Sequence, residues 1–197
     1  MKLLKSIIIS LFLIATLITN AQETDQLHII LVDSSWGKEI IKFPIDWAPK
    51  LTLEGFEELH FAPQWSNEEH EEFWSLVMAW KVKTISEIPL YELEFNLIHY
   101  FDGLMKPNHW ANEFPIPLAE FSHPVTTTNG FRFAGKLTFF DGFHTGKIIK
   151  INFLGHLISC KQTKESVIVF KFSPKNYNEP IWDKLNKISV IKEICPN

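Results

Sequence analysis

The stretch NEEHEEFW, residues 67–74, begins like a zinc-protease helix. In that motif two histidines four residues apart share one helix face, and a glutamate directly follows the first histidine. His70 is followed by Glu71, but a tryptophan stands where the second histidine is needed. A metal site assembled by the fold from His28, His60, His70 and nearby acids stays an alternative, because imidazole and carboxylate groups bind zinc. Since no spacing fixes such a site, we predict no metal and interpret the charges as a solvated loop.

Other catalytic patterns are also missing from the sequence. No serine stands in a Gly-x-Ser-x-Gly elbow, and the Ser, His and Asp residues are too scattered to nominate a triad. The acids Glu57 and Glu58 are adjacent, which on a strand points them to opposite faces, whereas a glycosidase needs two converging carboxyls. The pairs Asp102-Gly103 and Asp141-Gly142 are ordinary turn chemistry, with a ligand contact as the alternative. We therefore nominate no catalytic residue and no cofactor.

Aromatic residues are the strongest anomaly of composition, with 7 tryptophans and 17 phenylalanines. Most such rings fill a core, where each buries roughly 150 to 250 Å². Four tryptophans differ because they fall in expected loops: Trp36, Trp47, Trp65 and Trp110. Loop aromatics often line pockets. We therefore predict that these four bind a ligand.

The N-terminus has the three parts of an export signal: Lys2 and Lys5, an apolar run over residues 7–18, and small residues before Ala21. The apolar run is too short for a membrane span, which needs roughly 20 residues. We expect a signal peptide over residues 1–21, cleaved between Ala21 and Gln22, and a single domain over residues 22–197. No membrane span is expected after cleavage, and the mature protein is predicted to be periplasmic or secreted.

The charge balance and the cysteines refine this picture. The net charge of −4 becomes −6 once the two signal lysines are removed, and Arg132 is the only arginine. Nucleic acid, which is bound mainly by clustered Lys and Arg, is therefore an unlikely partner. In an oxidising compartment, the two cysteines Cys160 and Cys195 favour a disulfide over free thiols.

The pattern of apolar residues predicts an α+β fold with an antiparallel sheet. Residues 73–82 alternate with both faces apolar and the bulky side chains on one of them, which indicates a central strand covered on two sides. Further strands are expected over residues 27–32, 39–43 and 56–61, followed later by a three-stranded meander over 131–143, 148–160 and 166–172.

Two helices accompany these strands. Leucines and a phenylalanine at spacings of three and four predict a long helix over about 88–104, ending near Asp102-Gly103. A short helix is expected over about 180–190, with Trp182, Leu185 and Ile188 packed on the meander. Between the first helix and the meander, residues 106–130 contain four prolines and are expected to form a long irregular loop.

Several blocks of the sequence together resemble an uncharacterised family of exported bacterial proteins: FPIDWAP, FAPQW, EFWSLVMAW, YFDGLM and PIWDKLNKI. An antiparallel sheet closed by a C-terminal helix with a tryptophan is also similar to the PsbP/Mog1-like arrangement. Neither resemblance implies a catalytic residue.

The sequence thus favours a non-enzymatic exported binding or accessory domain with an aromatic-lined groove between the sheet, the long helix and the proline-rich loop. Its partner would be a small molecule, glycan, lipid or protein of the cell envelope. A cell-envelope hydrolase with a carboxylate or histidine site and a lipid or acyl-chain carrier are the alternatives.

Overall fold

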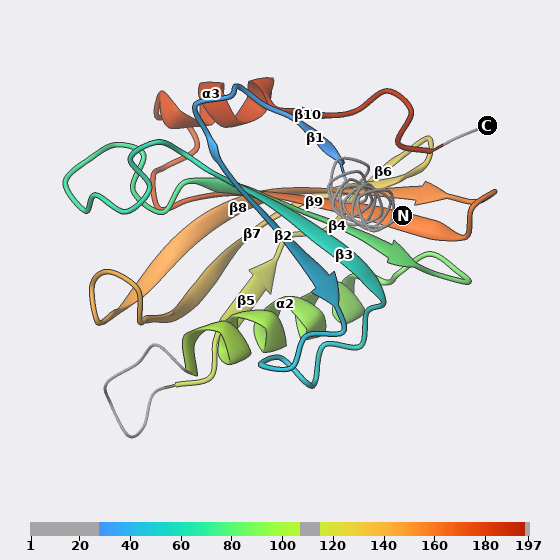
Figure 1. Cartoon of the computed structure of the whole chain (residues 1–197), viewed down its shortest axis with the longest axis horizontal. Helices are drawn as coiled ribbons and strands as arrows, with labels where there is room; N and C mark the ends of the chain where they lie inside the picture. The colour runs from blue at the N-terminus through green and yellow to red at the C-terminus, as the bar shows by residue number, and fades with distance from the viewer. Residues whose placement is uncertain (1–27, 107–114, 196–197) are drawn as a thin grey trace, which may run out of the picture.

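The computed structural model describes residues 28–106 and 115–195, and its main feature is a strongly curved antiparallel sheet (Figure 1). The strands run in the order β2-β3-β4-β9-β8-β7-β5, and β6 also pairs with β7. The strands are β2 (Gly37–Phe43), β3 (Gly55–Phe61), β4 (Leu76–Lys83), β5 (Leu118–Phe121), β6 (Val125–Thr127), β7 (Gly130–Asp141), β8 (Lys147–Cys160) and β9 (Glu165–Ser173). The predicted α+β class and the C-terminal meander are confirmed.

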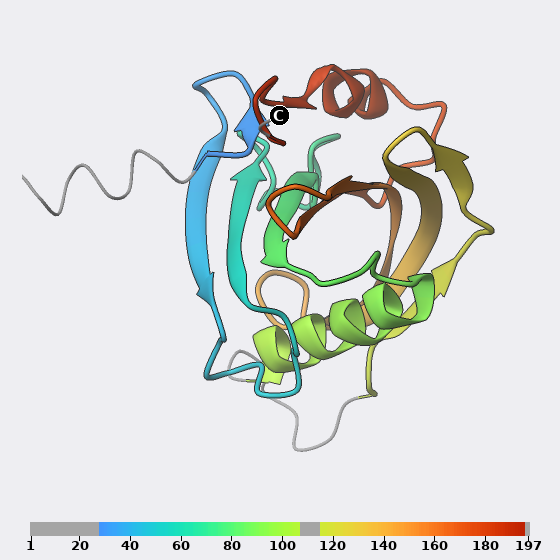
Figure 2. The same ribbon diagram turned by 90° about the vertical axis from the view of Figure 1, so that its right-hand side faces the viewer.

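The concave face of the sheet wraps around one helix, α2 (Leu90–Met105), which lies across the open side of the curve (Figure 2). Its buried Leu93, Leu97 and Phe101 belong to the same apolar cluster as Met78 and Trp80 of β4. This cluster is the main core of the domain.

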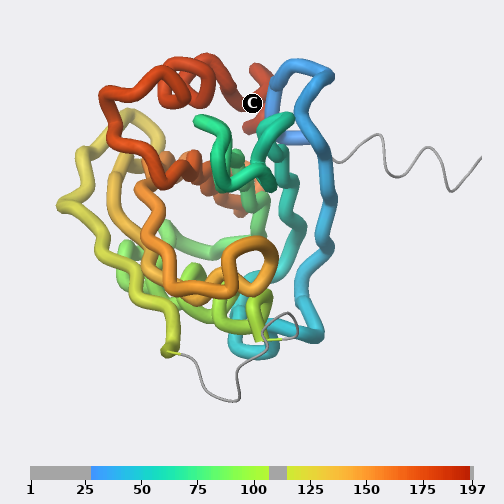
Figure 3. Tube along the Cα trace, turned by 90° about the vertical axis from the view of Figure 1, so that its left-hand side faces the viewer, coloured from blue at the N-terminus to red at the C-terminus, as the bar shows by residue number. Residues whose placement is uncertain are grey.

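The convex face is covered by the two ends of the described chain. The helix α3 (Ile181–Lys187) lies over it, and β1 (Ile30–Leu31) pairs with β10 (Ser189–Val190) in a second, two-stranded sheet. Figure 3 shows the N-terminal segment beside the C-terminal one at this side of the molecule. Trp182 and Leu185 are buried in a second apolar cluster with Val77 and Val169, as predicted for the C-terminal helix.

The predicted disulfide is present between Cys160, the last residue of β8, and Cys195. Their Cα atoms are 5.1 Å apart, and the two residues are 35 positions apart in the sequence. The bond ties the end of the chain to the convex side of the sheet. Within the two described ranges, no helix is long and apolar enough to cross a membrane.

The central strand alternates as predicted, because even-numbered residues from Leu76 to Val82 enter the main core while Val77 and Ala79 enter the outer cluster. The strand begins at Leu76 rather than at residue 73. Trp74 precedes it with a φ of +49°, a conformation that a bulky side chain rarely adopts and that cannot continue a strand. Trp74 therefore belongs to the connection between β3 and β4.

Three other expectations need correction. The loop expected over 106–130 contains two short strands, β5 and β6, which pair with β7 and each directly follow a proline, Pro117 and Pro124. Helix α2 continues past Gly103 to Met105, so Asp102-Gly103 does not end it. Helix α3 ends at Lys187 instead of about 190, because residues 189–190 form β10.

Candidate functional site

A cavity of about 410 Å³ lies between α2, the segment 44–54 and the β3–β4 part of the concave face. This volume falls in the range of roughly 300 to 1,000 Å³ that small-molecule sites occupy. Most of its lining residues are aromatic: Trp47, Phe61, Trp65, Trp74, Tyr100, Phe101 and Phe143. Glu39 is the one carboxylate among the lining residues. We call this cavity the aromatic pocket.

Gly103 of α2 determines where Trp47 lies. A Cβ atom at this position would lie 2.3 Å from the Trp47 carbonyl oxygen and 2.9 Å from the Ala48 Cα, so only glycine lets the segment approach the helix this closely. Thr52 donates its backbone N–H to Asn96 Oδ1 at 2.9 Å, which fixes the same segment to α2 nearer the N-terminus of the helix. The Trp47 ring then packs edge-on against Tyr100, with centroids 5.3 Å apart.

Trp65 forms the half-buried rim on the other side of the pocket. Its ring centroid lies 4.6 Å from that of Phe61 and 5.7 Å from that of Trp74. The Trp65 carbonyl accepts the backbone N–H of Trp74 at 2.8 Å, which ties the two ends of the β3–β4 connection together. Both indoles are therefore held in place by backbone contacts as well as by ring packing.

Trp74 combines an unfavourable backbone conformation with a buried hydrogen-bond donor that has no partner among the described residues. Its backbone is in the left-handed region, and its side chain is 1 % exposed. The indole Nε1–H finds no acceptor among the described residues. An unsatisfied buried donor costs roughly 1 to 3 kcal/mol. A strained residue with an unused hydrogen-bond donor, in the wall of a pocket, is a candidate ligand contact.

The turn between β7 and β8 places two further rings beside Trp74. Asp141 is fully buried and accepts the backbone N–H groups of Phe143, His144 and Thr145 at 2.9 to 3.2 Å. The Asp141-Gly142 pair is thus turn chemistry, as predicted. The turn brings the His144 ring to 4.7 Å from Trp65, and His144 Nε2 is a second buried nitrogen without a partner in the described part of the chain.

A buried acid lies behind the pocket wall. Glu57 of β3 accepts hydrogen bonds from the Tyr100 hydroxyl at 2.7 Å and from Trp80 Nε1 at 2.5 Å. Burial raises the pKa of Glu57 to about 8, although both hydrogen bonds act in the opposite direction. At neutral pH the folded protein therefore keeps this carboxyl largely protonated. Tyr100 links it to the pocket, since the tyrosine ring is part of the lining.

The neighbouring Glu58 points to the convex face, as the strand geometry predicts. It accepts the backbone N–H groups of Ile29 and Ile30 and contacts Lys38, His28 and His60. Burial would raise its pKa, but the bond from His60 and these further contacts lower it to about 2. Glu58 is therefore an anionic anchor for the segment that leads into β1.

The histidines and acids considered for a metal site do not converge on one point. His28 and His60 both contact Glu58, while His70 lies in the β3–β4 connection, 3.9 Å from Glu72. No group of three or more metal-ligating side chains with suitable geometry occurs in residues 28–106 and 115–195.

The interpretation of the acidic stretch as a solvated loop is correct only in part. Glu68, Glu69 and Glu71 are exposed, but Glu72 is buried. Glu71 and Glu72 both accept hydrogen bonds from Lys184 of α3, at 2.9 and 3.0 Å. Part of this stretch therefore holds the C-terminal helix.

The four predicted tryptophans fall in three places. Trp47 and Trp65 line the aromatic pocket. Trp36 packs on the convex face beside Lys184 and Lys187, far from that pocket in the fold. Trp110 and the cleavage position at Ala21 and Gln22 lie outside the described residues. Sequence reasoning missed Trp74, Tyr100 and Phe143, because it assigned Trp74 to a strand and did not single out the other two.

Comparisons of the chain with protein-family models, with curated proteins and with solved structures find no match. The resemblance to exported bacterial proteins and to the PsbP/Mog1-like arrangement stays a prediction. Functional inference therefore rests on the pockets and their chemistry.

Proposed function

We propose that the protein is a non-enzymatic, exported binding domain, and that its aromatic pocket takes a small ring-containing molecule with a hydrogen-bond acceptor. The observation that carries the proposal is that Trp74, a lining residue of the aromatic cavity, has a buried indole N–H without a partner among the described residues. Trp47 and Trp65, both half-buried, would cover opposite sides of the bound ring.

The chemistry of the lining supports this ligand class. Aromatic walls favour flat apolar molecules, because offset-stacked and edge-on ring pairs add roughly 0.5 to 1.5 kcal/mol to simple burial. Trp74 supplies the donor that would orient the ligand, as a few polar groups do in small-molecule sites. Glu39 at the lining disfavours anionic ligands, since its carboxylate would repel them.

Export is supported by the predicted signal over residues 1–21 and by the disulfide between Cys160 and Cys195. Disulfides persist in oxidising compartments and are rare in reducing ones. We therefore propose the periplasm or the cell exterior as the site of action.

A cell-envelope hydrolase is the second candidate, and Glu57 is the observation that favours it. A carboxyl that stays protonated near neutral pH can act as a general acid. Glu57 is 0 % exposed, however, and both of its oxygens already accept hydrogen bonds. Release of 4-methylumbelliferone from its acetate or N-acetylglucosaminide, lost in Glu57→Gln, would favour the hydrolase over the binding domain.

Two matched naphthalenes test the proposed ligand class. We expect 2-acetylnaphthalene, which has a carbonyl acceptor, to quench tryptophan fluorescence saturably. It should bind about tenfold more tightly than 2-ethylnaphthalene, since one hydrogen bond contributes roughly 0.5 to 1.5 kcal/mol. Palmitate and chitotriose complete the panel, and preferred binding of palmitate would support the acyl-chain carrier instead.

Trp65→Ala and Trp36→Ala form the control pair, because both tryptophans are half-buried but only Trp65 lines the pocket. Trp65→Ala should weaken binding of 2-acetylnaphthalene by about tenfold or more, while Trp36→Ala should leave it within about twofold. No quenching by any member of the panel, or equal losses in the two variants, would contradict the proposal.

A further inference from the structure

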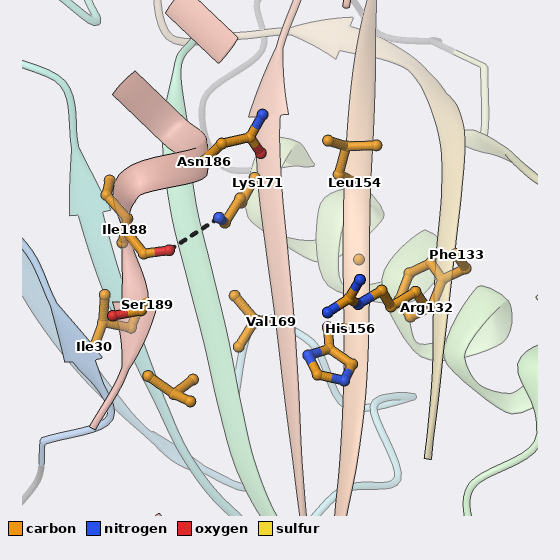
Figure 4. Close-up of a pocket in the computed structure, with 12 residues that line it drawn as sticks. Ile30, Arg132, Phe133, Leu154, His156, Val169, Lys171, Asn186, Ile188 and Ser189 are labelled. Carbon is orange, nitrogen blue, oxygen red and sulfur yellow. Dashed lines mark hydrogen bonds between the residues drawn. The ribbon is translucent and has the colours of Figure 1, made fainter. Parts of the chain in front are cut away.

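A second cavity, of about 510 Å³, lies on the convex face, on the side of the sheet opposite the aromatic pocket. Strands β7, β8 and β9 form its floor, and the end of α3 with β10 forms one wall (Figure 4). Its lining includes three basic side chains, Arg132, His156 and Lys171. We call this cavity the basic pocket.

The strand register brings the three basic groups together. Arg132 of β7 pairs directly with His156 of β8, and Lys171 of β9 pairs with Leu154, two residues away on the same face. Directly opposite side chains in an antiparallel sheet have Cβ atoms roughly 4.5 to 5.5 Å apart. Figure 4 shows the Arg132 guanidinium beside the His156 ring and Lys171 pointing toward the wall, where its Nζ donates to the Ile188 carbonyl at 2.9 Å.

The positive charge of this pocket is not neutralised by the described residues. Elsewhere on this side of the molecule Lys38 pairs with Glu58, Lys81 with Glu165, and Lys184 with Glu71 and Glu72. Arg132, His156 and Lys171 form no ion pair within residues 28–106 and 115–195. The chain has a net charge of −4 and a single arginine. A cavity that gathers this arginine, a histidine and a lysine without an acidic partner is therefore unusual for its composition.

The electrostatic environment agrees with an anion-binding site. Burial lowers the pKa of His156, and the nearby Arg132 and Lys171 charges lower it further. Burial and the Arg132 charge likewise lower the pKa of Lys171. The lining residues from α3 to β10 are all uncharged: Asn186, Ile188, Ser189 and Val190. A bound anion would offset the repulsion between Arg132 and Lys171 and would favour the protonated form of His156.

The rest of the lining is apolar and sets the shape of the ligand. The basic groups are surrounded by the apolar residues Ile30, Leu154, Val169 and Ile188. Val169 of β9 pairs with His156 of β8 on one side and with Ala79 of β4 on the other. We propose that the basic pocket binds a small organic anion, with its carboxylate or phosphate at Arg132, His156 and Lys171 and its apolar body against Val169 and Ile188. This site is independent of the aromatic pocket.

Isothermal titration calorimetry with benzoate, phenyl phosphate and the neutral benzamide tests this proposal. We expect benzoate or phenyl phosphate to bind and benzamide to bind at least about tenfold more weakly, since charge-assisted bonds are roughly twice as strong as neutral ones. NMR titration of the His156 ring supplies a second readout, because a bound anion stabilises the imidazolium and raises its pKa.

Arg132→Gln and Lys136→Gln are the matched variants, since both residues lie on β7 and are exposed, but only Arg132 lines the pocket. Arg132→Gln should weaken benzoate binding at least about tenfold, whereas Lys136→Gln should change it less than about twofold. Equal effects of the two variants would overturn the proposal. So would equal binding of benzoate and benzamide, or no heat from either anion up to about 10 mM.

A lipid headgroup offers the same phosphate chemistry as a soluble anion, and vesicles distinguish the two. The proposal expects the protein to stay in the supernatant when phosphatidylglycerol vesicles are sedimented. Sedimentation with these vesicles, lost in Arg132→Gln and without binding of benzoate or phenyl phosphate, would overturn the assignment to a small soluble anion.

Discussion

At the scale of single residues, the neighbours Glu57 and Glu58 show how strand geometry sets protonation. Glu57 faces the core, where burial raises its pKa to about 8. Glu58 faces the convex side, where contacts from His60, Ile29 and Lys38 outweigh burial and lower its pKa to about 2. The side-chain direction alone, which alternates along a strand, separates these two outcomes.

The two acids therefore affect stability in opposite pH ranges. A raised carboxyl pKa means that the folded state holds a proton that the unfolded state releases above about pH 4.5, so stability falls as pH rises toward 8. A lowered pKa means that Glu58 stabilises the fold above about pH 4.5 and that this contribution is lost as pH falls toward 2.

Glu57→Gln tests the first half of this argument. The variant removes a titration that reduces stability by about 1.4 kcal/mol per pH unit, so its free energy of unfolding should fall less between about pH 5 and pH 8 than that of the unmodified protein. Urea denaturation at the two pH values measures the difference, with Glu69→Gln in the exposed turn as the control. The same pH dependence in Glu57→Gln and in the unmodified protein would show that Glu57 is ionised in the fold.

At the scale of elements, the spacing of apolar residues predicted the strands and helices that bury an apolar face. It missed the short strands that form mainly by hydrogen bonding to a neighbouring strand. Alternation over residues 76–82 indicated a two-sided central strand because both faces are in fact covered. β5 and β6 have only four and three residues, and prolines precede each of them. Their formation depends on pairing with β7, which a local pattern cannot show.

The end of α2 was missed for a different physical reason. Asp-Gly usually favours the end of a helix because glycine adopts left-handed backbone angles easily. Here Gly103 stays inside the helix, and its missing side chain makes room for the Trp47 and Ala48 backbone. Only the tertiary contact distinguishes these two uses of the same residue.

Gly103→Ala should consequently disturb the pocket as well as the helix. We expect a loss of about 1 to 3 kcal/mol in unfolding free energy from overpacking, despite the better helix propensity of alanine. Binding of 2-acetylnaphthalene should weaken because the backbone that carries Trp47 must move. Tyr91→Ala, at an exposed position in the first turn of α2, is the control. An unchanged or increased stability of Gly103→Ala would contradict the close packing.

At the scale of the whole molecule, the curved sheet separates two cavities on its opposite faces. The aromatic pocket faces α2, and the basic pocket faces α3 and β10. The sequence singled out Trp47 and Trp65 because they stand in expected loops, and both line the aromatic pocket. It expected the groove beside the proline-rich loop over 106–130, whereas the described residues of that loop do not line the pocket. It did not predict the basic pocket, because Arg132, His156 and Lys171 meet only through the register of three strands.

The disulfide joins the outer layer to the sheet, and its removal tests how much that layer contributes. Closing a loop between residues 35 positions apart contributes roughly 3 to 4 kcal/mol on the chain-entropy model. Reductant should therefore lower the urea midpoint of the mature protein. The double variant Cys160→Ser, Cys195→Ser should start at the lower midpoint and show no response to reductant. An unmodified protein that titrates with two free thiols before reduction would exclude the bond.

The aromatic pocket is the central claim, and the indole N–H signal of Trp74 tests it most directly. In the ¹⁵N-labelled protein, Trp182 on the convex side already donates to the Lys175 carbonyl, so its signal serves as an internal reference. On addition of 2-acetylnaphthalene we predict a saturable downfield shift of the Trp74 signal, while those of Trp182 and Trp36 stay in place. A stationary Trp74 signal, or a shift confined to Trp36, would contradict the account.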